Sequence, residues 1–136
     1  MMQRIILLIF SIAAMAFATD YYDQYGSHTG RSKEDGNGNV NYYDQYGNRT
    51  GRSQTNGNQT NHYDRYGRNV GKTTYHGDRA NFYDKYGQST GRAVKNGNTI
   101  NYYDQYGSHV GKARINNDGS VYYYDKYGKN TGRSKK

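Results

Sequence analysis

The sequence contains no cysteine, no proline and no tryptophan among its 136 residues. Without cysteine there can be no disulfide staple and no thiol nucleophile, so stability must come from strand pairing and side-chain packing. Leucine and methionine do not occur after residue 18, and Phe82 is the one phenylalanine there. So few large apolar side chains place the chain near the compositional border of disorder. The 18 tyrosines argue against disorder, because each ring can bury apolar area while its hydroxyl keeps a polar partner.

The one long apolar run lies at the N-terminus, from Ile5 to Phe17, and is interrupted by Ser11. It ends in a small-x-small pattern at Ala18, which is typical of a signal-peptidase site. We therefore expect a signal peptide over residues 1–18, cleaved after Ala18, and a secreted or periplasmic bacterial protein. A membrane anchor is the weaker alternative, because the run is shorter than the ~20 apolar residues that a spanning helix needs. We expect no membrane span after the cleavage site.

The remainder, residues 19–136, forms a single repeat domain of six copies of one unit. The unit reads Tyr-Asp-x-Tyr-Gly-x-x-(Thr/Val)-Gly-(Arg/Lys), and successive aspartates are 20 or 21 residues apart. The repeated aspartates are Asp23, Asp44, Asp64, Asp84, Asp104 and Asp125. The glycines three residues later are Gly26, Gly47, Gly67, Gly87, Gly107 and Gly128. The cations eight residues after the aspartates are Arg31, Arg52, Lys72, Arg92, Lys112 and Arg133.

Each unit contains two turn signals. In Asp-x-Tyr-Gly, the aspartate suits the first position of a type I turn and the glycine suits the fourth, where positive φ is required. We therefore interpret the aspartates and these glycines as structural turn residues of hairpins with a glycine bulge. Between units lie Asn-Gly and related pairs such as Asn56-Gly57 and Asn96-Gly97, which are strong hairpin signals.

These turns predict an all-β fold of about six short antiparallel hairpins, with up to 12 strands. A closed ring removes the exposed strand edges that invite aggregation. The chain begins this domain with a Tyr-Tyr strand and ends with Thr131 to Ser134, which can pair with it. We therefore favour a closed rosette or shallow barrel over an open meander.

We also expect a definite register across the Asp-x-Tyr-Gly turn. The residue two before each aspartate should face the Thr or Val six after it, as in Tyr42 and Thr50. The residue three before, as in Asn41, should lie opposite the repeated glycine, as in Gly51. The sequence leaves open which face of the sheet is buried.

The repeated Tyr-Asp-x-Tyr-Gly and Gly-(Arg/Lys) motifs resemble those of the β-flower proteins, small secreted bacterial proteins made of tandem β-hairpins. The resemblance covers essentially all of residues 19–136 and implies a shallow, near-symmetric ring of hairpins. The repeat is similar, more loosely, to the tyrosine–aspartate repeats of polymorphic-toxin shells. The β-flower resemblance implies a fold but no activity, so function has to be argued from the residues.

We expect no enzymatic activity, no metal site and no cofactor. His28 and His109 share one repeat position, but other copies place unrelated residues there, whereas acid–base sites need fixed constellations. The segment that begins at Asp35 starts like a calcium loop, yet Val40 and Tyr46 occupy the positions that require glycine and an acidic residue. A flexible turn explains that segment better.

Two binding hypotheses remain. Without Arg4, the 19 basic residues become 18 against 11 acidic ones, a formal charge of +7, and six of those cations recur at equivalent positions. Such a field would attract anionic glycans, lipopolysaccharide or lipid head groups, with nucleic acid the least expected partner. The alternative is that each cation neutralises a nearby aspartate and only keeps the surface soluble.

The second hypothesis is a glycan-binding module that uses exposed tyrosines, since tyrosine combines a stacking face with a hydroxyl. The alternative, which we favour, is that the rings form the core, because little else in the sequence can. The sequence does not indicate the oligomeric state.

Overall fold

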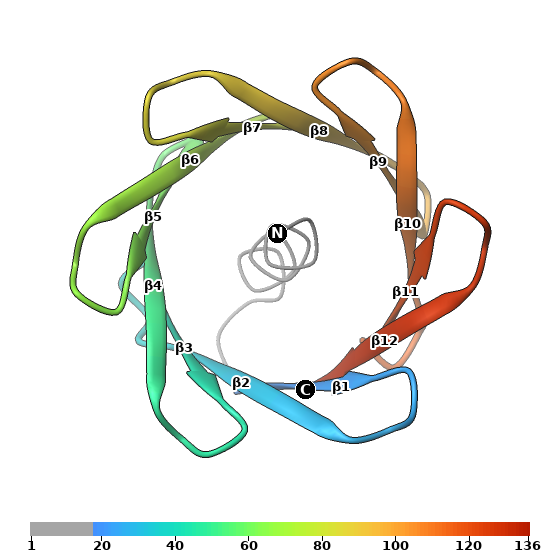
Figure 1. Cartoon of the computed structure of the whole chain (residues 1–136), viewed down its shortest axis with the longest axis horizontal. Coiled ribbons are helices and arrows are strands. Elements are labelled where there is room, and N and C mark those ends of the chain that lie inside the picture. The colour runs from blue at the N-terminus through green and yellow to red at the C-terminus, as the bar shows by residue number, and fades with distance from the viewer. Residues whose placement is uncertain (1–17) are drawn as a thin grey trace.

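The computed structural model describes residues 18–136, so the predicted signal peptide lies outside the described residues except for Ala18. Twelve antiparallel strands form one closed barrel in which each strand pairs with its neighbours in sequence (Figure 1). The strands are β1 (Thr19–Asp23), β2 (His28–Glu34), β3 (Asn39–Asp44), β4 (Arg49–Asn56), β5 (Gln59–Asp64), β6 (Asn69–His76), β7 (Arg79–Asp84), β8 (Ser89–Asn96), β9 (Thr99–Asp104), β10 (His109–Ile115), β11 (Val121–Asp125) and β12 (Asn130–Lys135). The predicted all-β closed ring is confirmed.

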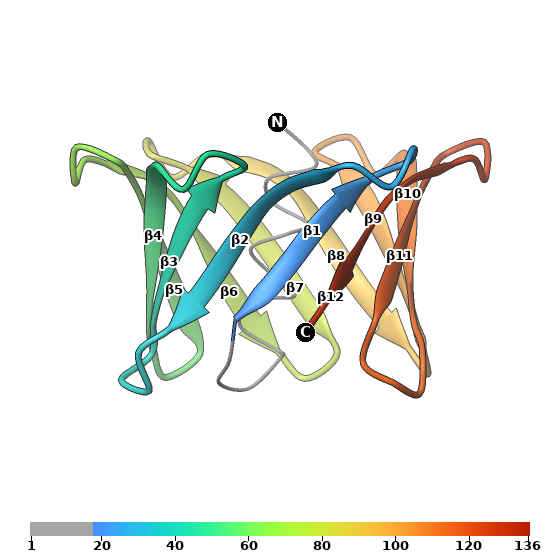
Figure 2. The ribbon, with the colours of Figure 1, turned by 90° about the horizontal axis from the view of Figure 1, so that it is seen from below.

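The barrel closes where its first and last strands meet. Strand β1 pairs antiparallel with β12, with Tyr21 opposite Ser134 and Tyr22 opposite Arg133. The expectation that the two end segments complete the circle is therefore confirmed. Figure 2 shows the strands tilted across the wall, and the loops at one end splay outward from the barrel. We call the splayed end, which holds the six Asp-x-Tyr-Gly turns, the tyrosine rim.

The Asp-x-Tyr-Gly turns have the geometry that the sequence predicts. In the first, the amide of Gly26 donates to the carbonyl of Asp23 at 3.1 Å, and Gly26 has φ of 84°. The Asp23 Oδ1 atom accepts from the amides of Tyr25 and Ser27, both at 2.9 Å. The other five turns repeat these contacts. The aspartates are thus turn caps, as expected.

The predicted register across these turns is wrong by one residue. Tyr42 lies opposite Gly51, not Thr50, and Asn41 lies opposite Arg52. The cause is a β-bulge just after the turn, because Tyr43 pairs with Arg49 and Thr50 is left as the extra residue. The same shift occurs in all six hairpins.

The strand of the next unit explains the second repeated glycine. A Cβ on Gly51 would lie 2.6 Å from the carbonyl oxygen of Tyr63 on the neighbouring strand. The equivalent glycines meet the equivalent tyrosine carbonyls in every unit. This glycine is therefore repeated because two strands approach closely in mid-sheet, and not because of a turn.

The inward face carries the residue two before each aspartate and a small residue nine after it. Four of these pairs are hydrogen-bonded: Tyr21 with Ser32 at 2.9 Å, Tyr42 with Ser53 at 3.1 Å, His62 with Thr73 at 2.8 Å and Tyr123 with Ser134 at 3.1 Å. In the other two units the small residue is alanine, so Phe82 is followed by Ala93 and Tyr102 by Ala113 at the same sequence distance, and neither alanine can supply a hydroxyl. The inner surface is apolar over β7 to β11, where these alanines lie, and rich in hydroxyls elsewhere.

Candidate functional site

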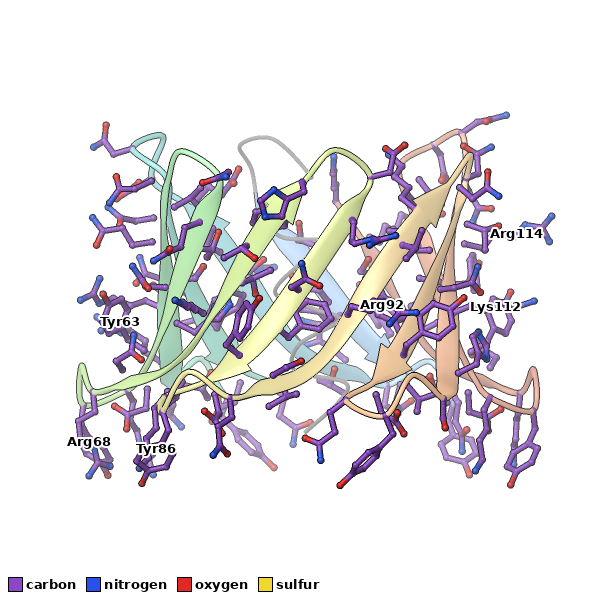
Figure 3. The ribbon with its side chains drawn as sticks, turned by 90° about the horizontal axis from the view of Figure 1, so that it is seen from above. Tyr63, Arg68, Tyr86, Arg92, Lys112 and Arg114 are labelled. Carbon is purple, nitrogen blue, oxygen red and sulfur yellow. The ribbon has the colours of Figure 1, made fainter. Side chains whose placement is uncertain are left out.

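The six repeated cations form one level on the outside of the barrel wall, and we call them the cation belt. Each is opposite the tyrosine that precedes the aspartate of the next unit, as Arg52 is opposite Tyr63. Successive side chains of a strand point to opposite faces of the sheet. The residue two before each aspartate points into the barrel, so the tyrosine directly after it points outward. Figure 3 shows Tyr63, Arg92 and Lys112 on this outer wall, with Arg114 nearby.

Five belt cations lie over the ring of the opposite tyrosine. The cation-to-centroid distances are 4.3 Å for Arg52 on Tyr63, 5.4 Å for Lys72 on Tyr83, 4.7 Å for Arg92 on Tyr103, 5.7 Å for Lys112 on Tyr124 and 4.8 Å for Arg133 on Tyr22. These are cation–π contacts, worth about 0.5–1 kcal/mol each at exposed sites. They orient the cations but leave their positive charge uncompensated.

Five of the six belt cations form no ion pair with a carboxylate within residues 18–136. Within residues 18–136 the ion pairs are Arg31 with Asp20, His28 with Asp20, and Arg68 with Asp64. Arg31 is the one belt member among them, at 2.8 Å from its carboxylate. The alternative that each cation neutralises a nearby aspartate therefore fails for five of the six.

Asp20 is the exception in the outer wall. It occupies the position three before the aspartate, opposite Arg31, where four other hairpins have asparagine. Its Oδ1 atom accepts from Arg31 Nε at 2.8 Å and lies 3.2 Å from His28 Nε2. The hydrogen bond from Arg31 lowers the pKa of this carboxyl below its ordinary value, with smaller contributions from His28.

The tyrosine rim is the second candidate surface. The six tyrosines inside the Asp-x-Tyr-Gly turns are 69–83% exposed: Tyr25, Tyr46, Tyr66, Tyr86, Tyr106 and Tyr127. Tyr86 projects from the splayed end in Figure 3, as does Arg68. The expectation that the rings form the core holds for inward-facing residues such as Tyr21, Tyr102 and Tyr123, and it is wrong for the rim.

Cations accompany half of the rim tyrosines. Arg65 and Arg68 each lie 5.2 Å from the Tyr66 ring centroid. Lys85 and Lys126 lie at the same distance from Tyr86 and Tyr127. The rim aspartates add carboxylates at this level, although one oxygen of each is occupied by two backbone amides. Backbone hydrogen bonding, chiefly from Asn48, lowers the pKa of the Asp44 carboxyl, so that group stays ionised at neutral pH.

The histidines do not converge with other reactive groups. His28 pairs with Asp20, and His109 Nε2 lies 3.1 Å from the Asn101 side-chain oxygen. Among the described residues no group of three His, Cys, Asp or Glu side chains could hold a metal ion. Residues 18–136 also contain no helix long and apolar enough to cross a membrane.

Comparisons with known proteins give no family for this chain. No family model matches it, and no curated protein matches it. Solved structures include a mutant of S. aureus TarM in complex with fondaparinux, alpha-GlcNAc-glycerol and UDP, at 13% identity and a TM-score of 0.29. That match covers 75% of this chain and 21% of the other, so this chain spans about a fifth of that protein. At this TM-score the likeness carries no argument about fold or function.

Proposed function

We propose that this chain is an exported, non-enzymatic bacterial module that binds anionic glycans through the cation belt. The observation that carries the proposal is the set of five cations that lie over tyrosine rings with no carboxylate partner among the described residues. An acidic sugar polymer laid around the wall meets alternating guanidinium or ammonium groups and aromatic faces. Carboxylates or sulfates suit the cations, and sugar rings suit the partly covered tyrosines.

Repetition makes the proposed binding multivalent. The belt offers the same pair of groups in consecutive units around a closed circle. A polymer that engages one pair presents its next acidic group to the neighbouring pair at high effective concentration. Lipid head groups share the anionic chemistry, but they do not present a flexible chain that can follow the wall. We therefore place polymeric acidic glycans first.

The test is binding to immobilised polygalacturonate over a range of salt concentrations. The triple variant Arg52→Gln, Lys72→Gln, Arg92→Gln should bind at least about tenfold more weakly than the unchanged chain, a loss of about 1.4 kcal/mol. The matched control is Arg65→Gln, Arg68→Gln, Lys85→Gln, which removes the same number of charges from the tyrosine rim. Equal losses in the two variants would show that net charge alone drives binding and would refute the belt as the site.

A second candidate function is the binding of neutral glycans by the tyrosine rim. The observation that favours it is the exposure of six rings at one end of the barrel. The variant Tyr46→Ser, Tyr66→Ser, Tyr86→Ser tests it on an array of neutral glycans. Signals that the unchanged chain gives and this variant loses would support the rim, and signals that the variant retains would contradict it.

A further inference from the structure

The wall between the first two units differs from the rest of the belt. A groove of about 360 Å³ lies there, lined by His28, Arg31, Lys33, Tyr43, Asp44, Gln45 and Gly47. Its volume falls within the ~300–1,000 Å³ range of small-molecule sites. The lining combines the cations Arg31 and Lys33, the rings of His28 and Tyr43, the carboxylate of Asp44 and the amide of Gln45.

One substitution in the repeat explains the groove. Arg31 is opposite Tyr43 in register, as the other belt cations are opposite their tyrosines. Asp20 holds Arg31 by a hydrogen bond at 2.8 Å, whereas the corresponding Asn61 and Asn81 leave Lys72 and Arg92 on their rings. Within the described part of the chain, Tyr43 is the one residue of its set without a cation over its ring.

The groove therefore presents features that the other units lack together. The Tyr43 ring is left without its cation, Lys33 is exposed, and Arg31 is fixed beside it by Asp20. The amide of Gln45 adds a donor and an acceptor at the rim side. A ligand that matches this set has a ring with one apolar C–H face, an acidic group for the cations and hydroxyls for the Asp44 and Gln45 side chains.

We infer that the groove over Tyr43 is a discrete binding site for a short acidic sugar, in which the sugar ring stacks on Tyr43 and its carboxylate meets Lys33 and Arg31. The inference deepens the proposed function, because it names a compact uronic-acid unit as the ligand of one particular site. It rests on that function only for the ligand class. The groove binds one molecule per chain, whereas the belt binds a polymer at many points.

The test follows chemical shifts of the ¹⁵N-labelled chain during titration with digalacturonate, with cellobiose as neutral control and benzoate as non-sugar acid. The unchanged chain should saturate at one equivalent, with shifts confined to β2, β3 and the turn at residues 44–47. Shifts spread evenly over six units, or preferential binding of benzoate, would overturn the site or its ligand class.

The decisive variant is Asp20→Asn, which frees Arg31 to cover Tyr43. It should weaken digalacturonate binding by about tenfold, the loss expected when one stacked contact is removed. The same variant adds one unit of positive charge, so an account based only on charge predicts tighter binding. Tighter digalacturonate binding by Asp20→Asn would overturn the inference.

A gain-of-site variant uses the fifth unit, which has His109, Lys112 and Arg114 at positions equivalent to His28, Arg31 and Lys33. Asn101→Asp should draw Lys112 away from Tyr124 and add a second set of shifts there. Absence of this second set would overturn the role assigned to Asp20.

Polygalacturonate binding separates the two proposals, because Asp20→Asn retains the belt. Loss of digalacturonate binding with retained polymer binding is the expected pattern, and loss of polymer binding in the unchanged chain refutes the proposed function instead.

Discussion

Tyr102 gives the sharpest test of how the inner face is stabilised. Its side chain is fully buried, and its hydroxyl has no hydrogen-bond partner among the described residues. The reason is Ala113, which stands eleven residues after Tyr102, since Tyr21, Tyr42 and Tyr123 each bond to the serine eleven residues after them. The variant Tyr102→Phe recreates the combination of Phe82 and Ala93 that the preceding unit has at these two repeat positions. A buried hydroxyl without a partner costs about 1–3 kcal/mol.

We expect Tyr102→Phe to stabilise the barrel by about 1 kcal/mol, the lower end of that cost, because the ring itself is retained. For a domain of this size the corresponding rise in melting temperature is about 4 °C. Differential scanning calorimetry and urea denaturation measure the two quantities. Ala113→Ser should stabilise the barrel in the same direction by supplying the missing partner.

The matched control is Tyr123→Phe, the same chemical change in a neighbouring unit. It breaks the bond of 3.1 Å to Ser134 and leaves that hydroxyl unpaired, so it should destabilise the barrel by about 1–2 kcal/mol. Opposite signs for the two variants support the pairing rule between aromatic and small residues. A loss of stability in Tyr102→Phe equal to that in Tyr123→Phe would refute it.

Three further predictions concern pH, close packing and the rim. Burial lowers the pKa of His62 to about 4, so this side chain is neutral in the fold. The free energy of unfolding should therefore fall by about 3 kcal/mol as the pH drops from about 6.5 to 4. Urea denaturation at several pH values measures this dependence, and His62→Phe should flatten it. Gly51→Ala forces a Cβ to 2.6 Å from the Tyr63 carbonyl oxygen and should lower the melting temperature by more than about 8 °C. Gly26→Ala adds a Cβ that meets nothing within 4 Å, so it should lower the melting temperature by about 4 °C, through the positive φ alone. Tyr86→Ser should leave the melting temperature within about 2 °C, because the side chain is exposed, and a larger fall in calorimetry would show that the rim is structural.

Local chemistry made the turns predictable. Gly26 follows Asp23 by three positions, and the type I turn with a glycine bulge follows from their side-chain and backbone preferences alone. Closure also followed, because the last strand of the domain is complementary to the first, as the second strand of one unit is to the first strand of the next. These features depend on residues near one another in the repeat.

The register across these turns could not be predicted from the sequence, because the position of a bulge depends on how the neighbouring strands pair. Gly51 belongs in mid-strand only because the Tyr63 carbonyl lies so close, and that approach is invisible until the strands are paired. The one-residue shift places Tyr42 opposite Gly51 and Asn41 opposite Arg52. The belt contacts were missed for the same reason, since Arg52 meets Tyr63 from the next unit.

The distribution of tyrosines was predicted only in part. Inward residues such as Tyr21 and Tyr123 are core, as the shortage of aliphatic side chains suggested. The rim tyrosines share the residue type but lie at the third position of a turn, where no strand can cover them. Asp20 carried the one available signal for the groove, because it stands where the repeat has asparagine.

The most direct test of anionic glycan binding is elution of the chain from a heparin column. A belt of uncompensated cations on the outer wall predicts elution above about 0.15 M salt, the physiological value, and much earlier elution of the Arg52→Gln, Lys72→Gln, Arg92→Gln variant than of its rim control. Elution of the unchanged chain below that salt concentration, or identical elution of the two triple variants, would contradict the account.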